Sequence, residues 1–306
     1  MPRRLLYLLI LFVLAGLLLF VPLPIAPTYA GRTLEDAAHT PLFFLVTLGV
    51  LFTMRDHPRF QGASLYALAG MIGVGAGFLS EVIQRPLARD ASWEDVAADA
   101  VGSFLALAVY AMFERRTKLR VWQRLGALVV ALSCIAIFLA PIVRMTRAYV
   151  HRNGQFPVIA DFHSRIELYW TLSIGVNREI VDDALEVELV ADVFPGVSFH
   201  EPVPDWRAYR TLIIDVANPD SEPLHLGVRV HDRHHKRSNF NDRFNRGYDL
   251  KAGERRTLRI PLEDIRHGPR QRLMDMAHIS DITLFRGGRS SRAGSHHLRV
   301  YSLRLE

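Results

Sequence analysis

The first half of the chain consists of long, nearly uninterrupted apolar runs separated by short polar segments. A bilayer core is crossed by about 20 consecutive, mostly apolar residues in helical form. The pattern therefore predicts five membrane-spanning helices, at about residues 5–21, 37–54, 63–83, 93–113 and 125–143. The third and fourth runs contain acidic residues, but their length and their glycine and alanine content still suit packed membrane helices.

Small residues recur at every fourth position in two of these runs. They are Ala69, Gly73 and Gly77 in the third run, and Ala98, Gly102 and Ala106 in the fourth. Residues four apart lie on the same face of a helix. Small side chains on one face let helix backbones approach closely where lipid provides no hydrophobic drive to associate. We therefore expect close helix packing along both faces.

The first run has two interpretations. Thr28-Tyr29-Ala30 has the small-residue spacing of a signal-peptide cleavage site. The apolar core is longer than the roughly 7–15 residues typical of a signal peptide, which favours an uncleaved anchor. Either interpretation places the segment that follows outside the cytoplasm.

Basic residues indicate the orientation of the helices. Residues 114–124 contain five Arg or Lys side chains, and residues 55–59 contain two more. The loops of the opposite side contain only Arg32, Arg85 and Arg89. Basic loops face the cytoplasm, so the N-terminus is expected inside. With five spans, everything after Met145 is expected outside the cytoplasm.

Six polar residues lie at the predicted outer boundary of the second, third and fourth helices. They are His39, Glu81, Gln84, Arg89, Asp95 and Asp99. Polar groups in lipid are costly and are often functional. Structural roles are also open, because Asp95 could cap its helix. Pairing of Glu81 with Arg89, or of Asp99 with His39, could also stabilise the bundle.

The order of these residues resembles the VanZ-like family of membrane domains. The resemblance rests on His39, Gly77-x-x-x-Glu81-x-x-Gln84, Arg89 and Asp95-x-x-x-Asp99-x-x-Gly102. It covers about residues 1–115. Two positions depart from the family pattern, since Asp36 replaces the usual Lys and Asp99 the usual Asn. The resemblance implies a role in the cell envelope, with some relatives linked to glycopeptide resistance, and implies no settled catalytic mechanism.

Beyond about residue 153 the chain changes to alternating apolar and polar positions. The alternation is found at about residues 185–189, 212–216, 224–230, 258–260, 282–284 and 298–305. Such runs, separated by turn residues, predict strands with one buried face in a sandwich or barrel. Residues 156–170 could supply a first strand or a linking helix. The predicted fold is a multidomain membrane protein, with a helical domain at 1–150 and an all-β sandwich at 151–306.

The order of features in this second half resembles a galactose-binding-like jelly roll of the carbohydrate-binding type. The matching residues are Asp161-Phe162, Asp205-Trp206-x-x-Tyr209, Asn218-Pro219, Val230-His231-Asp232, residues 241–245, Leu250, Gly253 and residues 260–265. The resemblance covers about residues 155–306. It implies a fold that often binds glycans, although some members serve only as structural modules.

Sugar recognition requires aromatic faces for stacking and polar groups for hydroxyls. The candidate ligand-binding residues are Trp206, Tyr209, Asp232, Asn241, Asp242, Arg243, Phe244 and Asn245. Trp206 and Tyr209 could instead belong to the core at a sandwich edge. Residues 231–246 are interpreted as a long polar loop between two strands, which is a usual place for a binding site. A solvated hairpin is the alternative.

The charge of the chain indicates the kind of partner that it would bind. The chain has a formal net charge of +6, and basic residues are frequent at 233–246, which favours an anionic partner such as an acidic polysaccharide, a phosphate-bearing polymer or lipid headgroups. No nucleic-acid module is visible, and no cofactor is expected. The set His231, Asp232, His234 and His235 matches no established metal-ligand spacing, so no metal is predicted. The single cysteine, Cys134, cannot form an intramolecular disulfide.

These features predict a membrane-anchored protein of the cell envelope, in the bacterial cytoplasmic membrane, that recognises a glycan or lipid-linked saccharide on the outer side. One alternative is a membrane enzyme acting on a lipid-linked phosphate or sugar through His39, Glu81 and Asp99, whose side chains permit acid–base chemistry. Another is a structural assembly module with no small ligand. The chain contains no established catalytic motif, which favours a role other than catalysis.

Overall fold

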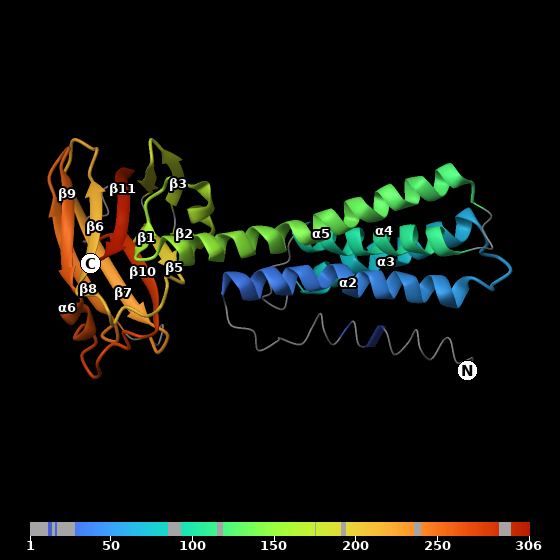
Figure 1. The fold of residues 1–306 in the computed structure, drawn as a ribbon, viewed down its shortest axis with the longest axis horizontal. Coiled ribbons are helices and arrows are strands. Elements are labelled where there is room, and N and C mark those ends of the chain that lie inside the picture. Colours follow the sequence, from blue (N-terminus) through green and yellow to red (C-terminus); the bar gives the residue numbers. More distant parts are fainter. Residues whose placement is uncertain are drawn as a thin grey trace. The chain divides into compact units, whose positions relative to one another are not determined.

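The chain folds into two compact units, Met1–Met145 and Thr146–Glu306. The first is helical and the second consists mainly of strands (Figure 1). The division lies close to the predicted boundary at residue 150. The computed structural model describes residues 12–13, 16, 28–84, 93–114, 119–174, 176–190, 194–235, 240–287 and 295–306.

Four helices in the described part of the chain are long and apolar enough to cross a membrane. They are α2 (Tyr29–Met54), α3 (Ala63–Gln84), α4 (Trp93–Phe113) and α5 (Val121–Gln155). The bounds of α3 and α4 agree with the predicted third and fourth runs. The predicted first helix, at 5–21, lies outside the described residues apart from Phe12, Val13 and Gly16.

Two predicted helix ends were wrong. Helix α2 begins at Tyr29 because the Thr28 hydroxyl caps it by accepting a hydrogen bond from the Gly31 N–H at 3.0 Å. Helix α5 continues to Gln155, well beyond the predicted residue 143. In both cases polar turns extend the helix past its apolar run. Hydropathy therefore detects the membrane-like part of a helix and misses the rest.

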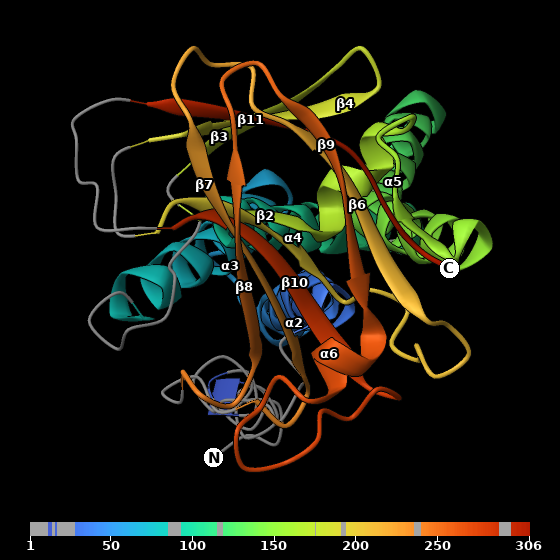
Figure 2. The same ribbon diagram turned by 90° about the vertical axis from the view of Figure 1, so that its left-hand side faces the viewer.

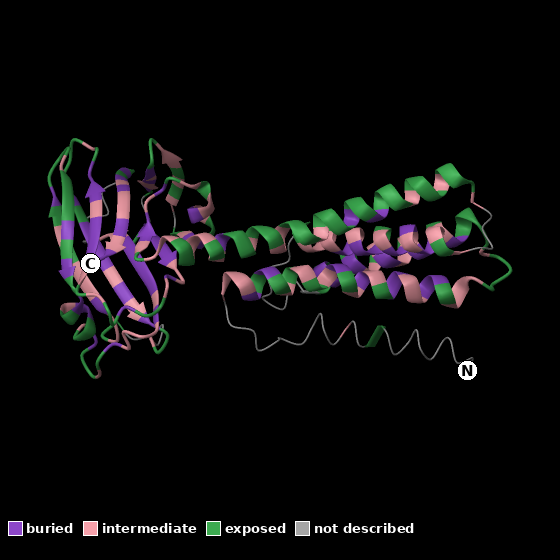
Figure 3. Ribbon diagram, viewed as in Figure 1, coloured by how far each residue is buried: buried purple, intermediate pink, exposed green. Residues whose placement is uncertain are grey.

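Helices α2, α3 and α4 pack closely where the small residues lie. A Cβ on Gly102 of α4 would collide with the carbonyl oxygen of Thr40 in α2, and one on Gly77 of α3 would lie 2.6 Å from Asp99 Oδ2. The Thr40 hydroxyl donates to the Ala98 carbonyl across the same contact, at 3.1 Å. The expected close packing of both glycine-containing faces is therefore present. The buried positions of these helices lie on their facing sides (Figure 3).

Two β-sheets make up most of the second unit, and all of their strand pairings are antiparallel. The six-stranded sheet has the order β3-β4-β11-β6-β9, with β1 also paired to β11, and the five-stranded sheet has the order β2-β5-β10-β7-β8. Figure 2 shows β8, β7 and β10 side by side. The predicted all-β sandwich is confirmed.

The bounds of the strands and short helices follow the chain. They are β1 (Val158–Ala160), η2 (Arg165–Trp170), β2 (Thr171–Ile174), β3 (Val176–Val181), β4 (Ala184–Leu189), β5 (Gly196–His200), β6 (Thr211–Ala217), β7 (Leu224–Asp232), β8 (Phe244–Leu250), β9 (Arg255–Pro261), α6 (Leu262–Arg266), β10 (Ile279–Arg286) and β11 (His296–Leu305). Residues 156–170 thus contain both a strand and a short helix, so neither single interpretation was complete.

Two of the strands that the sequence pattern missed, β5 and β8, belong to the five-stranded sheet. Strand β5 is short and carries four consecutive buried residues, so it lacks visible alternation. Strand β8 has only two fully buried residues, Phe244 and Leu250, and its interior is polar. For that reason the predicted loop at 231–246 was too long, since its two ends belong to β7 and β8.

We predict that Gly102→Ala weakens the helical unit. The new methyl group would force α4 away from the Thr40 carbonyl, and overpacking of this kind costs about 1–3 kcal/mol. Gly75→Ala in α3 is the matched control, because nothing lies within 4 Å of a Cβ at Gly75. Thermal unfolding of both variants in detergent measures the difference. Equal stability of the two variants would contradict the packing described here.

Candidate functional site

The five-stranded sheet has one face in the core and an opposite face, here called the outer face. In β7, Val228 and Val230 point into the core. Successive side chains of a strand point to opposite faces, so Arg229 and His231 belong to the outer face. The antiparallel register extends this alternation to the neighbouring strands. Arg229, for example, lies beside Asn245 of β8 and Thr283 of β10.

Cross-strand neighbours form three rows on the outer face. The first row is His200, Asp281 and His231, the second is Ser198, Thr283, Arg229 and Asn245, and the third is Gly196, Phe285, Gly227 and Gly247. Arg243 stands two residues before Asn245 and continues the first row on the same face. The three rows bring together residues from four strands that are far apart in the sequence.

An aromatic ring lies flat in the third row. A Cβ on Gly227 would collide with the ring of Phe285, so only glycine leaves room for the ring there. The Arg229 guanidinium lies 4.9 Å from the centre of the same ring. The ring of Phe194 meets it edge to face, with the two centres 6.1 Å apart. The result is a partly exposed aromatic surface set directly on the sheet.

Asp281 organises the centre of the outer face. Its carboxylate accepts hydrogen bonds from the hydroxyls of Ser198 at 2.6 Å and Thr283 at 2.7 Å. It also contacts His200 Nδ1 at 2.9 Å. Burial alone would raise the pKa of Asp281, but the hydrogen bond and charge of His200 hold this pKa below its ordinary value. A fixed carboxylate in this position holds the surrounding side chains in place.

Three polar atoms on the outer face have no internal partner. Arg229 Nε, Arg243 Nε and Asn245 Oδ1 are buried and make no hydrogen bond within the described part of the chain. Native proteins pair the large majority of such atoms. Burial, followed by the charge of Arg229, lowers the pKa of Arg243 to about 10. These donors and this acceptor are therefore not used by hydrogen bonds within the described part of the fold.

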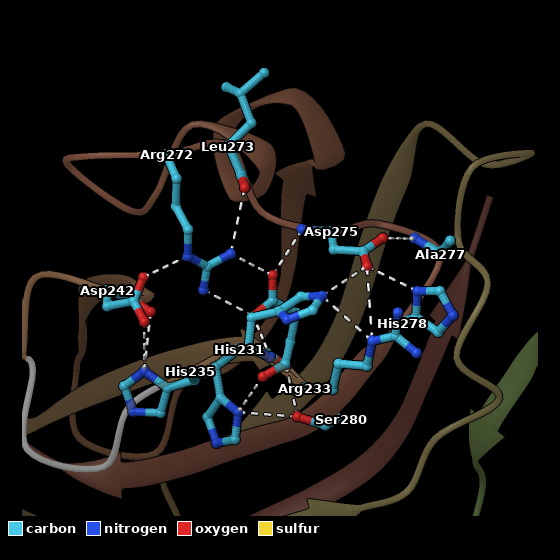
Figure 4. Close-up of polar contacts among 12 residues, drawn as sticks. His231, Arg233, His235, Asp242, Arg272, Leu273, Asp275, Ala277, His278 and Ser280 are labelled. Atoms are coloured by element: carbon cyan, nitrogen blue, oxygen red, sulfur yellow. Dashed lines mark hydrogen bonds and ion pairs between the residues drawn. The ribbon is translucent and has the colours of Figure 1, made fainter.

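The predicted loop residues Asp232 and Asp242 have a different role. Arg272 binds both, with Nη2 at 2.8 Å from Asp232 Oδ1 and Nε at 2.6 Å from Asp242 Oδ1 (Figure 4). Asp232 also accepts hydrogen bonds from the backbone N–H groups of His234 and Asp275, and it is 1% exposed. The predicted ligand-binding role was therefore wrong for Asp232, because its carboxylate is occupied within the fold.

The predicted aromatic residues are mostly core. Trp206 is 0% exposed and donates its indole N–H to the Val203 carbonyl at 2.9 Å. Phe244 is 3% exposed. Neither presents a face for stacking, so that prediction was wrong for both, and the core interpretation of Trp206 was right. Tyr209 lines a pocket of about 550 Å³ together with residues of α6 and of 274–277.

The structure thus brings only part of the predicted set to one surface. Arg243 and Asn245 lie on the outer face. Asn241 is exposed in the loop before β8, and its carbonyl accepts a hydrogen bond from the Arg270 N–H. The outer-face residues that sequence reasoning missed are Arg229 of β7, Ser198 and His200 of β5, and Asp281, Thr283 and Phe285 of β10. The alternation in β7, Leu226-Gly227-Val228-Arg229-Val230, was the one signal that could have identified Arg229.

The polar residues of the helical unit are partly assembled. His39 Nδ1 of α2 lies 2.9 Å from Asp99 Oδ1 of α4, and Asp99 is 0% exposed. Glu81 of α3 is buried as well. Asp95 is half-buried in the first turn of α4. The structure describes Gln84 only as the last residue of α3, and Arg89 lies outside the described residues.

No three His, Cys, Asp or Glu side chains converge as metal ligands within the residues that the structure describes. The set of His231, Asp232, His234 and His235 is used otherwise. His231 Nδ1 contacts Ser280 Oγ at 3.0 Å, and its ring packs against that of His235 with centres 4.6 Å apart. Burial lowers the pKa of His231.

Comparison with known proteins gives a likeness in fold to carbohydrate-binding modules. A family 11 carbohydrate-binding module from Clostridium thermocellum, solved with a β-1,3-1,4-mixed-linked tetrasaccharide, is 16% identical with a TM-score of 0.37, over 48% of this chain and 93% of the module. A family 29 carbohydrate-binding module is 13% identical with a TM-score of 0.33, over 49% of this chain and 89% of the module. Both match the β-sandwich.

Enzymes are also among the similar structures. An exo-β-agarase is 13% identical with a TM-score of 0.39, over 49% of this chain and 24% of the enzyme. The chain thus spans less than a quarter of that enzyme. No protein-family model matches the chain, and no curated protein matches it. The resemblance to VanZ-like domains therefore stays a prediction.

We predict that Arg272→Gln strongly destabilises the β-sandwich. The substitution leaves the buried Asp232 carboxylate without its charge partner, and breaking a buried pair in this way costs about 3–5 kcal/mol. Arg207→Gln is the control, because its partner Asp205 is exposed and no measurable change is expected. Chemical unfolding of the purified chain, followed by near-ultraviolet circular dichroism, measures both.

The same pair sets an acid dependence. Burial raises the pKa of Asp232, but the Arg272 hydrogen bonds outweigh it and hold the pKa below its ordinary value. The stabilisation is therefore present above about pH 4, the pKa of an unperturbed Asp, and is lost as the pH falls through the folded-state pKa. The wild-type chain should lose more stability than Arg272→Gln below this pH. Parallel losses would contradict the assignment.

Proposed function

We propose that this chain is a membrane-anchored protein of the cell envelope that recognises a saccharide through the outer face of its five-stranded sheet. One observation carries the proposal. Arg229, Arg243 and Asn245 each have an unpartnered polar atom on this face, and the Arg229 guanidinium lies over the partly exposed ring of Phe285. Binding sites typically combine apolar or aromatic surface with a few placed polar groups.

This combination suits the chemistry of a sugar. A pyranose ring has an apolar C–H face that can stack on an aromatic ring, and hydroxyls at its rim that both donate and accept hydrogen bonds. The Arg Nε atoms supply donors and Asn245 Oδ1 supplies an acceptor. The four strands of the outer face lie about 4.8 Å apart, so the face is wide enough for several linked sugar units.

Membrane anchoring is part of the proposal because the helices expose large apolar side chains. Those of α3, α4 and α5 include Met71, Phe78, Leu79, Phe104, Leu132 and Ile137. A soluble protein rarely exposes so much contiguous apolar surface. In a membrane, lipid tails would cover this apolar surface, so its exposure would carry no hydrophobic penalty. The basic residues at 55–59 and 114–124 support a cytoplasmic location for those loops, and this topology supports an outer location for the β-sandwich.

We predict that Asn245→Ala weakens saccharide binding about tenfold, the effect of losing roughly 1.4 kcal/mol of hydrogen bonding. Asn177→Ala is the matched control, because Asn177 lies in β3 of the other sheet. The purified full chain is titrated calorimetrically with a panel of envelope polysaccharides and lipid-linked saccharides. Absence of binding by a folded chain would contradict the proposal and favour a structural assembly module. An equal loss of saccharide affinity in Asn245→Ala and Asn177→Ala would show that the binding site is not on the outer face.

A second candidate function rests on the helical unit. The His39–Asp99 contact at 2.9 Å joins a partly buried His to a buried Asp on two different helices, and His and Asp side chains are usual in general acid–base catalysis. The candidate activity is hydrolysis or transfer at a lipid-linked phosphate or sugar. Catalysis is less well supported than saccharide recognition, because the His39–Asp99 pair can also serve only to hold α2 and α4 together.

The catalytic candidate predicts that His39→Ala and Glu81→Gln each abolish turnover of a lipid-linked phosphate or saccharide by the chain in proteoliposomes. Release of phosphate or sugar is measured by chromatography. His57→Ala is the control, since His57 lies in the exposed turn after α2. Two outcomes would eliminate this candidate. One is unchanged turnover in both His39→Ala and Glu81→Gln, and the other is no turnover by the wild-type chain.

A further inference from the structure

Arg229 and Arg243 are neighbours on the outer face. Arg229 is the direct cross-strand partner of Asn245, and Arg243 lies two residues before Asn245. Their Cα atoms are therefore diagonal neighbours, at a typical separation of about 7–8 Å. Both point to the same side of the sheet, so their guanidinium groups can reach a single ligand group placed between them.

Each guanidinium rests on an aromatic ring. Arg229 lies 4.9 Å from the centre of Phe285, and Arg243 lies 4.8 Å from the centre of Phe240. Stacking on a ring restrains a guanidinium while leaving the N–H groups at its edge free to donate. Both side chains are thus held in position before any ligand binds.

These two arginines lack the ion pairs that other arginines of the β-sandwich form. Other arginines of the β-sandwich have carboxylate partners, among them Arg246, Arg255, Arg259, Arg272 and Arg299. Neither Arg229 nor Arg243 forms an ion pair with any carboxylate that the structure describes. Asp281 attracts Arg229 electrostatically without forming an ion pair with it, and its carboxylate is bound by Ser198, Thr283 and His200.

Two partly buried charges of the same sign that lack ion pairs are costly. Taking a charged group out of water without a partner is unfavourable, and the two guanidiniums also repel one another. The lowered pKa of Arg243 reflects both effects. An anionic group placed between the two side chains would relieve both costs at once. Guanidinium groups form strong, often bidentate hydrogen bonds with carboxylates and phosphates.

We propose that the saccharide recognised here is anionic, and that an acidic group of its sugar units binds between Arg229 and Arg243. This inference rests on the proposed function and narrows it to a substrate class. The shared chemistry is a carboxylate, sulfate or phosphate ester carried on a polysaccharide. Asn245, on the same face, contacts the neutral part of the sugar.

The test compares polysaccharides that differ only in charge. Polygalacturonate is paired with its methyl ester, dextran sulfate with dextran, and a phosphomannan with its dephosphorylated form. Calorimetric titration of the full chain gives an affinity ratio for each pair. At least one acidic polymer should bind about tenfold more tightly than its neutral partner, the effect of one charge-assisted hydrogen-bonded contact. The pair that shows the preference identifies the acidic group.

Variants locate the preference. Arg243→Gln and Arg229→Gln should each bring the acidic-to-neutral ratio close to one. Arg259→Gln removes the same charge from β9 of the other sheet, where Arg259 pairs with Glu306 at 2.9 Å, and should leave the ratio unchanged. Circular dichroism spectra establish that each variant is folded.

The failures are distinguishable. Equal binding of acidic and neutral polymers by the wild-type chain overturns the anionic class and leaves saccharide recognition standing. The placement between Arg229 and Arg243 is overturned if the preference for acidic polymers survives in both Arg229→Gln and Arg243→Gln. It is also overturned if Arg259→Gln reduces that preference as much as they do. Failure of the folded chain to bind any polymer overturns the proposed function, and the anionic class with it.

Discussion

The antiparallel register of the five-stranded sheet determines which side chains meet on its outer face. Because side chains alternate along each strand, one core-facing position fixes the direction of every other position in the sheet. Val228 and Val230 in the core place Arg229 outside, and the pairing of β7 with β8 and β10 then adds Asn245 and Thr283. A slip of one residue would bury these polar groups and expose the core.

Electrostatic pairing separates the structural polar residues from the available ones. Asp232 and Asp281 are both buried carboxylates, and each is surrounded by donors from several parts of the chain. Their partners are complete, so they hold loops and strands in place. Arg229 and Arg243 lie on the same sheet and have no such partners among the described carboxylates. The contrast between satisfied and unsatisfied groups therefore identifies the surface that a ligand would use.

Close helix approach plays the corresponding part in the first unit. Gly77 and Gly102 remove the side chains that would otherwise separate α3 and α2 from α4. This approach brings His39 within 2.9 Å of Asp99, although the two residues are distant in sequence. The sandwich and the bundle thus share one principle, in which glycine admits a neighbouring group that no larger residue would tolerate. In the sandwich that group is the Phe285 ring on Gly227.

The sequence by itself determined the composition of the two halves, because apolar runs and period-two alternation are local properties. It correctly predicted α3, α4 and the all-β class. It also singled out Arg243, Asn245, His39 and Asp99. The ends of α2 and α5 were missed because polar turns can continue a helix beyond its apolar run. Strands β5 and β8 were missed because one lacks alternation and the other has a polar interior.

Only the tertiary structure decided which polar residues are free. The sequence contains Asp232, Asp242 and Arg243 close together in a polar stretch and gives no reason to separate them. Arg272, far along the chain, binds the first two, whereas Arg243 is brought beside Arg229 by strand pairing. Partners of this kind depend on long-range register, which a pattern of neighbouring residues does not contain. For the same physical reason, Trp206 could be recognised as core only once its surroundings were known.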